Sequence, residues 1–246
     1  MPFNITENSF ICFNPINSYW ESCKVFVVFP VCCVSIYNHN TYVFSNFFFF
    51  LVPFFWTSAY RVIASLAIGT ALAVPIAQVC ARSHVLDTLF APVLYLLYPI
   101  PKVVLLPILL VLLGLADAPK IVLISLTVFF QVLVAVRDAV RSVPEGALLS
   151  IRALGGGLLD EYRHVTIPAT MPAVFTSLRI GVGTAIAVLF IAEAMAGSTG
   201  LGYFIMQSWS MVNYPRMFAG IIAMALLGVV LYAIFDLLER RLTRWR

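Results

Sequence analysis

The sequence predicts an all-α polytopic membrane protein with about six transmembrane helices and a helical loop on the cytoplasmic side. The 246-residue chain is 62% hydrophobic and only 11% charged, and its mean hydropathy is +0.99. Soluble proteins, by contrast, contain about 25% charged residues. A helix needs roughly 20 residues to cross the hydrocarbon core, so the chain has room for six or seven spans and short loops. This length excludes a large soluble enzyme or nucleic-acid-binding domain beside the spans.

The first part of the chain, residues 1–57, differs in composition from the rest. It holds four of the five cysteines and seven of the eight asparagines. The cysteines show no C-x-x-C or Cys/His spacing, so no metal site and no disulfide framework are expected. Residues 25–60 contain no Lys, Arg, Asp or Glu. We therefore expect one uncertain span there, near residues 42–57, where Pro53 interrupts the apolar run.

Five further spans are expected after residue 60. The apolar segments that are long enough, or nearly so, are residues 62–81, 86–115, 121–136, 174–195 and 217–238. The second segment carries four prolines and has Lys102 near its middle. Because proline removes a backbone donor and clashes with the preceding turn, this segment is expected to be kinked or divided into two half-helices.

The distribution of Lys and Arg predicts the orientation of the spans. If the loop after the third of these segments and the C-terminal tail are cytoplasmic, that side holds nine arginines. The opposite side then holds Arg61, Lys120 and Arg216. This asymmetry places both termini in the cytoplasm. The net charge of +4 thus reports topology, and no nucleic-acid partner is expected.

The cytoplasmic loop, residues 137–172, has a helical pattern of its own. Pro144 suits the first turn of a helix, and Glu145 complements the positive end of the helix dipole. Apolar residues then recur at three- and four-residue spacing as far as Leu154. Gly155 and the two glycines after it are expected to end this helix, because glycine accepts the backbone angles of a sharp reversal.

A second short amphipathic helix is expected over residues 158–165, and Pro168 is expected to stop it. Two helices around a glycine break, tethered to the membrane at both ends, form a rigid knob. Such a knob predicts docking into a groove of a cytoplasmic partner. The alternative is a loop helix that simply lies on the surface.

The same residues resemble a known family. Gly155, nine further residues and then Val165-Thr166-Ile167-Pro168 are similar to the "G, nine residues, I-x-L-P" signature of ABC-importer permeases. Tyr98-Pro99-Ile100-Pro101 and Gly200-Leu201-Gly202-Tyr203 resemble the subgroup of nitrate, sulfonate, taurine and bicarbonate permeases. One feature departs from the family. The Glu-Ala-Ala that usually precedes the loop glycine falls on Leu149-Ser150-Ile151, so its Glu is absent or replaced by another residue such as Glu145.

The resemblance implies that residues 58–246 form the transmembrane domain of an importer permease in the cell inner membrane. Its solute would be of the sulfonate, taurine, nitrate, bicarbonate or vitamin-precursor type, and therefore small and in several of these cases anionic. The implied partners are an ABC ATPase subunit, an extracytoplasmic solute-binding protein, a second permease copy and membrane lipid. The residues implied in coupling to the ATPase are Glu145, Leu154, Gly155, Val165, Ile167 and Pro168.

The chain lacks the Gly-x-x-x-x-Gly-Lys-[Ser/Thr] phosphate loop, so ATP hydrolysis is expected from the partner and not from this subunit. No catalytic residue, cofactor or metal site is expected either, since the three histidines are far apart in sequence. The alternatives are a membrane-embedded lipid-modifying enzyme and a passive channel. Such an enzyme would need a cluster of polar residues at one depth, which the spans are expected to lack, and a channel would need no docking knob.

Two ionisable residues at membrane depth are candidates for the translocation pathway. Lys102 could face the pathway and attract an anionic solute, or its side chain could extend to the membrane interface. Glu193 could line the outer mouth of the pathway or pair with a neighbouring residue.

Overall fold

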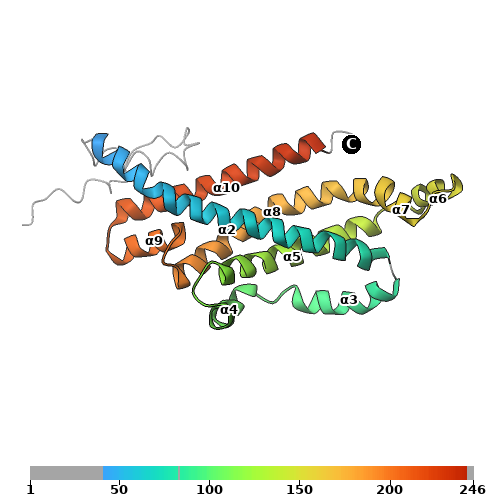
Figure 1. Cartoon of the computed structure of the whole chain (residues 1–246), viewed down its shortest axis with the longest axis horizontal. Helices are drawn as coiled ribbons and strands as arrows, with labels where there is room; N and C mark the ends of the chain where they lie inside the picture. The colour runs from blue at the N-terminus through green and yellow to red at the C-terminus, as the bar shows by residue number, and fades with distance from the viewer. Residues whose placement is uncertain (1–40, 83, 243–246) are drawn as a thin grey trace, which may run out of the picture. The chain divides into compact units, whose positions relative to one another are not determined.

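The computed structural model describes residues 41–82 and 84–242, and every regular element in this part of the chain is helical (Figure 1). Residues 1–40 and the arginines at positions 244 and 246 lie outside the described residues, so most of the unusual N-terminal segment does as well.

The first described helix, α2 (Thr41–Arg82), is continuous for 42 residues. It contains both the expected span near residues 42–57 and the span at residues 62–81, so the former is not a separate element. Pro53 and Pro75 lie inside the helix without ending it. Proline is tolerated in membrane helices because neighbouring groups satisfy the freed carbonyls. Nothing between the two apolar runs is long or polar enough to form a turn.

The next segment is divided, as its prolines predicted. Helix α3 (His84–Leu97) is followed by a short 3₁₀-helix, η1 (Lys102–Leu105), and by α4 (Leu106–Leu113). The chain bends by 83° at the break between them. Helix α5 (Ala118–Arg141) is the next span and extends a few residues beyond the expected range at both ends.

The loop that was expected in the cytoplasm forms two helices, as its pattern predicted. Helix α6 (Glu145–Ala153) ends at the three glycines, and α7 (Leu158–Glu161) follows. The expectation that Pro168 stops the second helix is wrong. A π-helical turn, η2 (Tyr162–Thr166), leads directly into α8 (Ile167–Ala196). Pro168 occupies the first turn of α8, where its missing N–H has no intrahelical partner to lose.

The chain ends in a short helix and a long one. Helix α9 (Leu201–Ser210) lies in what looked from the sequence like a plain connection, and α10 (Tyr214–Leu242) follows it. In the described part of the chain, four helices are long and apolar enough to cross a membrane, or five if the bent pair is one span. Five agrees with the number expected after residue 60.

Helix α8 packs against α5 on one side and α10 on another, and α9 packs against both α8 and α10 (Figure 1). Helices α2 and α5 approach closely at Gly69, where a Cβ atom would lie 2.8 Å from the Ser125 carbonyl oxygen. Small residues permit such close approach between membrane helices. The buried core of Val62, Leu123, Val128, Ala185 and Leu189 lies along these contacts.

Candidate functional site

Polar side chains gather at two places along α2, one near its middle and one at its C-terminal end. Arg61 belongs to one cluster and Arg82 to the other. Arg82 follows Arg61 by 21 residues in one continuous helix, which corresponds to about 31 Å. This separation matches the thickness of the hydrocarbon core. The two clusters are therefore separated by about one thickness of the hydrocarbon core.

The docking element, defined as residues 144–166, lies at the Arg82 end. Gly155 has a φ angle of +83°, in the left-handed region that glycine adopts without strain. Next to it, a Cβ atom on Gly156 would lie 2.5 Å from Ile151 Cγ2. These two glycines therefore permit the reversal between α6 and α7.

The tip of the docking element presents large apolar side chains. Leu154 is 88% exposed, and Leu149 and Leu159 are exposed as well. Apolar groups on a loop outside the spans are typical of a surface that binds a partner. The docking element therefore presents a leucine-rich tip.

The residues implied in coupling lie at three places. Leu154 and Gly155 lie at this tip, and Glu145 begins α6. The side chain of Glu145 is outside the described part. Val165, Ile167 and Pro168 are partly buried where the docking element joins α8, so the structure does not bring them to the tip.

Sequence reasoning missed Glu161, the most connected residue of the docking element. Its side chain is only 1% exposed and receives hydrogen bonds from Arg152 of α6 and from Arg82, the last residue of α2. The bond to Glu161 raises the pKa of Arg152 above its ordinary value. The only local signal was an acid among arginines in a charged loop, and its pairing with Arg82 spans 79 residues.

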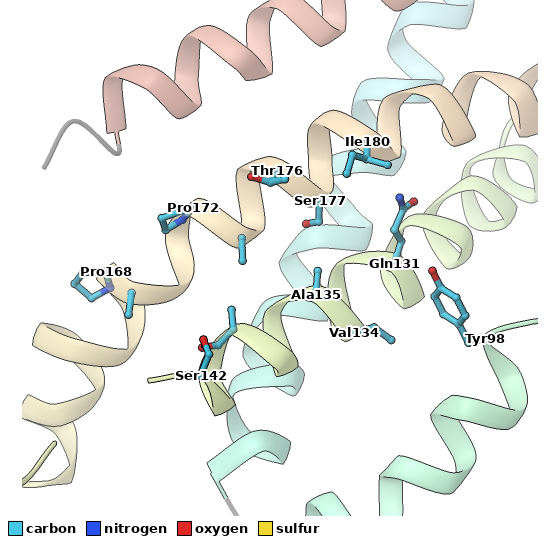
Figure 2. Close-up of a pocket in the computed structure, with 13 residues that line it drawn as sticks. Tyr98, Gln131, Val134, Ala135, Ser142, Pro168, Pro172, Thr176, Ser177 and Ile180 are labelled. Carbon is cyan, nitrogen blue, oxygen red and sulfur yellow. The ribbon is translucent and has the colours of Figure 1, made fainter. Parts of the chain in front are cut away.

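A groove of about 780 Å³ lies between α5 and α8 and reaches the base of the docking element (Figure 2). None of its lining residues is charged. Gln131, Ser142, Thr176 and Ser177 contribute polar groups, while small residues such as Ala135 leave the space open. In Figure 2 the side chains of Thr176, Ser177 and Ile180 project from α8, and Gln131 and Ala135 project from α5.

Lys102 lies beside this groove. Its ammonium donates a hydrogen bond to the Tyr98 carbonyl oxygen and lies 5.3 Å from the Tyr98 ring centroid and 5.1 Å from that of Phe130. Tyr98 lines the groove, and Phe130 precedes the lining residue Gln131. Four arginines of the membrane-spanning helices, at positions 61, 82, 137 and 179, contact carboxylates. No carboxylate contact is recorded for Lys102 within the described residues.

The second cluster, around Arg61, joins four segments of the chain. Arg61 is 1% exposed and uses all five of its N–H donors. Two of them bond Asp117, one bonds the Glu193 carboxylate at 2.6 Å, and two bond the carbonyl and hydroxyl oxygens of Thr199. Arg61 therefore ties α2 to the start of α5, to the end of α8 and to the loop before α9. Lys120 is buried beside this cluster.

Glu193 is fully buried in this cluster, so the structure favours the pairing alternative over a place at the pathway mouth. Its carboxylate accepts hydrogen bonds from Ser58, Arg61 and the Gly202 backbone N–H. A Cβ atom on Gly200 would lie 2.2 Å from Glu193 Oε1. Gly200 also has a φ angle of +107°. The Gly-Leu-Gly motif is therefore the stretch of backbone that closes around this carboxylate.

The expectation that the spans lack a polar cluster at one depth is thus wrong. The reason is that Ser58, Arg61, Asp117 and Glu193 come from three distant segments. Their donors and acceptors are occupied by one another, as expected of a structural ion-pair network. No group of three or more His, Cys, Asp or Glu residues in the described part could hold a metal ion.

Comparison with known proteins gives a consistent result. Residues 69–244 match the family model described as "Binding-protein-dependent transport system inner membrane component". A Brucella abortus (strain 2308) protein described as a probable ABC transporter permease is 30% identical over 80% of this chain and 78% of its own length. The taurine transport system permease protein of Escherichia coli (strain K12) is 27% identical over 75% of this chain and 67% of its own.

The fold is also similar to that of a chain in the inward-facing structure of the MetNI methionine ABC transporter. The TM-score is 0.67 at 19% sequence identity, over 78% of this chain and 96% of the other.

Proposed function

The chain belongs to the family of binding-protein-dependent transport system inner membrane components, and we propose that two copies of it enclose a solute pathway between their α5–α8 grooves. As an ABC importer permease subunit, the chain spans the membrane several times. One observation carries the proposal. The groove walls are α5 and α8, and these are the two helices that continue into the docking element. A partner that moves the docking element therefore moves both walls.

Transport through such a pathway requires free energy to shift the protein between two conformations. A pathway open to one side at a time alternates between two conformations, and a partner shifts their balance only by binding them with different affinities. A shift from 1:99 to 99:1 needs about 5.5 kcal/mol of differential binding. The leucine-rich tip at Leu149, Leu154 and Leu159 is where a nucleotide-dependent partner would apply that difference.

The family implies an ABC ATPase subunit and an extracytoplasmic solute-binding protein as partners. We place the docking element and the C-terminus in the cytoplasm and the Arg61 cluster at the outer face of the cell inner membrane. The beginning of α2 then lies on the outer side, because one continuous helix replaces the two spans that were expected there. The Lys and Arg distribution supports this orientation. The subunit carries no catalytic residue in this proposal. A lipid-modifying enzyme is not favoured, since the polar cluster in the spans is saturated by its own contacts, and a passive channel would not need the docking tip.

Purification of the tagged full chain from the membranes of its host tests the assignment. We expect an ATP-hydrolysing complex that contains two copies of this chain, measured by ATP turnover and by light-scattering mass. Two exposed leucines, one in the docking tip and one in the turn before α5, serve as test and control positions. Leu154→Glu should abolish ATP turnover in the eluate, whereas Leu115→Glu, between α4 and α5, should retain it. An eluate of the unaltered chain without ATP turnover would rule out the importer assignment.

We further propose that Lys102 makes the groove favourable for anions. In a background without cysteines, Ala135→Cys places a thiol in the groove. Its reaction rate with a negatively charged methanethiosulfonate relative to a positively charged one reports the local potential. A charge interaction of about 1 kcal/mol favours the anionic reagent and disfavours the cationic one by roughly fivefold each, which changes the ratio by roughly 25-fold. Lys102→Met should lower this ratio by that factor, while Lys102→Arg should preserve it. Equal ratios in all three proteins would show that Lys102 does not act on the groove.

A further inference from the structure

We infer that Glu161 is a positioning residue that fastens the docking element to α2, so that motion of the ATPase-bound helix α6 is passed to α2 as well as to α5 and α8. This inference rests on the proposed function. It concerns a different part of the machinery from the tip, since Glu161 is buried and does not belong to the exposed leucine surface.

The backbone attaches the docking element to the membrane helices at two points only. One is the turn at Ser142 and Val143, which follows α5. The other is the π-helical turn η2, which precedes α8. Single π turns within helices are frequent at functional sites, where the regular hydrogen-bond ladder is interrupted. An element that is attached at two points can still rotate about the line that joins them.

Glu161 supplies the third attachment. Its Oε1 accepts a hydrogen bond from Arg152 Nε, and its Oε2 accepts one from Arg82 Nη2. The second guanidinium nitrogen of Arg152 lies 3.3 Å from Oε2. One carboxylate thus bridges α6 and the last residue of α2. Charge-assisted bonds of this kind are stronger and more directional than neutral ones, so the bridge resists rotation of the docking element relative to α2.

Gln78 reinforces the bridge from the same face of α2, one turn before Arg82. Its Oε1 accepts a hydrogen bond from the Tyr162 hydroxyl, and its Nε2 donates one to Thr170 Oγ1 at 3.3 Å. Gln78 is buried at 3% exposure. Side chains four residues apart on a helix share a face. Gln78 and Arg82 therefore form a polar seam that holds both Glu161 and the beginning of α8.

The bridge explains how α2 takes part in the conformational change although it does not line the groove. Without the bridge, the hydrogen bond from Tyr162 to Gln78 is the side-chain link that still joins the docking element to α2, so the docking element turns more freely about its two backbone attachments and leaves α2 behind. With the bridge, a displacement of α6 is applied directly to the end of α2. In the resembled family a Glu precedes the loop glycine, and in this chain that position is Leu149. Glu161 supplies an acid at another position of the docking element, where it contacts Arg152 and Arg82.

Pulsed electron paramagnetic resonance on the full complex with its ATPase, in lipid nanodiscs, tests this inference. In a cysteine-free background, a spin label at Val79→Cys reports α2, and one at Ser150→Cys reports α6. Both sites are exposed. The distance between equivalent labels in the two permease copies is measured without nucleotide and with ATP and orthovanadate. We expect both distances to change in the otherwise unaltered protein. In Glu161→Gln and in Arg82→Met, the α6 change should persist and the α2 change should fall by at least half.

Asp160→Asn is the matched control, because it neutralises the neighbouring exposed acid and keeps an oxygen that accepts from the Gly157 N–H. Its α2 change should equal that of the unaltered protein. The inference is overturned if α2 keeps its full displacement in Glu161→Gln or Arg82→Met, or if α2 does not move in the unaltered complex. It is also overturned if both variants lose the ATPase subunit, because Glu161 would then shape only the docking surface. Failure of the unaltered chain to bind an ATPase would instead contradict the proposed function.

Discussion

Replacement of Gly155 by valine should uncouple ATP hydrolysis from transport and leave the protein in the membrane. The φ angle of +83° at this residue costs an L-residue about 1–2 kcal/mol, and more when the residue is β-branched. Such a cost lowers the population of the native reversal between α6 and α7 by about tenfold or more. The tip would then no longer present Leu154 in the geometry that its partner requires. Solute uptake per ATP hydrolysed should therefore fall by at least that factor.

The loop offers a matched control for this prediction. Gly146 lies inside α6, and a Cβ atom there meets nothing within 4 Å. Gly146→Ala should therefore be neutral or slightly stabilising, by about 0.5–1 kcal/mol, since alanine is the better helix former. Uptake and ATP hydrolysis are measured together with the amount of permease in the membrane fraction. Normal uptake in Gly155→Val would show that this loop is not the coupling element.

Replacement of Arg61 by methionine should cause a large loss of stability. It removes five hydrogen bonds and leaves the fully buried carboxylate of Glu193 without its cation. Breaking a buried ion pair in this way costs about 3–5 kcal/mol. For a protein of this size that loss corresponds to a decrease of about 10 °C in the unfolding midpoint. The decrease is measured by thermal unfolding of the purified protein in detergent.

Two further variants separate the ion pair from other effects. Arg61→Met combined with Glu193→Met should lose less than the sum of the two single changes, because the pair is then removed together and no lone charge stays buried. Arg216→Met, at an exposed arginine in the first turn of α10, should change the free energy of unfolding by no more than about 0.5 kcal/mol. Strict additivity in the double variant would show that Arg61 and Glu193 stabilise the fold independently.

The spans and the two helices of the loop could be predicted because their signals are local. A charge-free run of sufficient length, four prolines in one segment and three consecutive glycines each restrict the backbone within a few residues. The errors arose where local patterns permit two outcomes. Pro53 is compatible with a break or with a continuous membrane helix, and Pro168 with the end of one helix or the first turn of the next. Neighbouring helices decide between these outcomes, and the sequence does not show them.

The sequence by itself determined that this protein is a bundle of membrane helices with a two-helix loop broken at glycines, because hydropathy and glycine placement act over short stretches of chain. Only the tertiary structure decided what the buried charges do. Glu193 meets Ser58 across 135 residues and Arg61 across 132, and Glu161 meets Arg82 across 79. A buried charge is stable only where the fold brings it an opposite charge and matching donors. Those partners belong to other helices, so they follow from packing and not from the pattern around each residue.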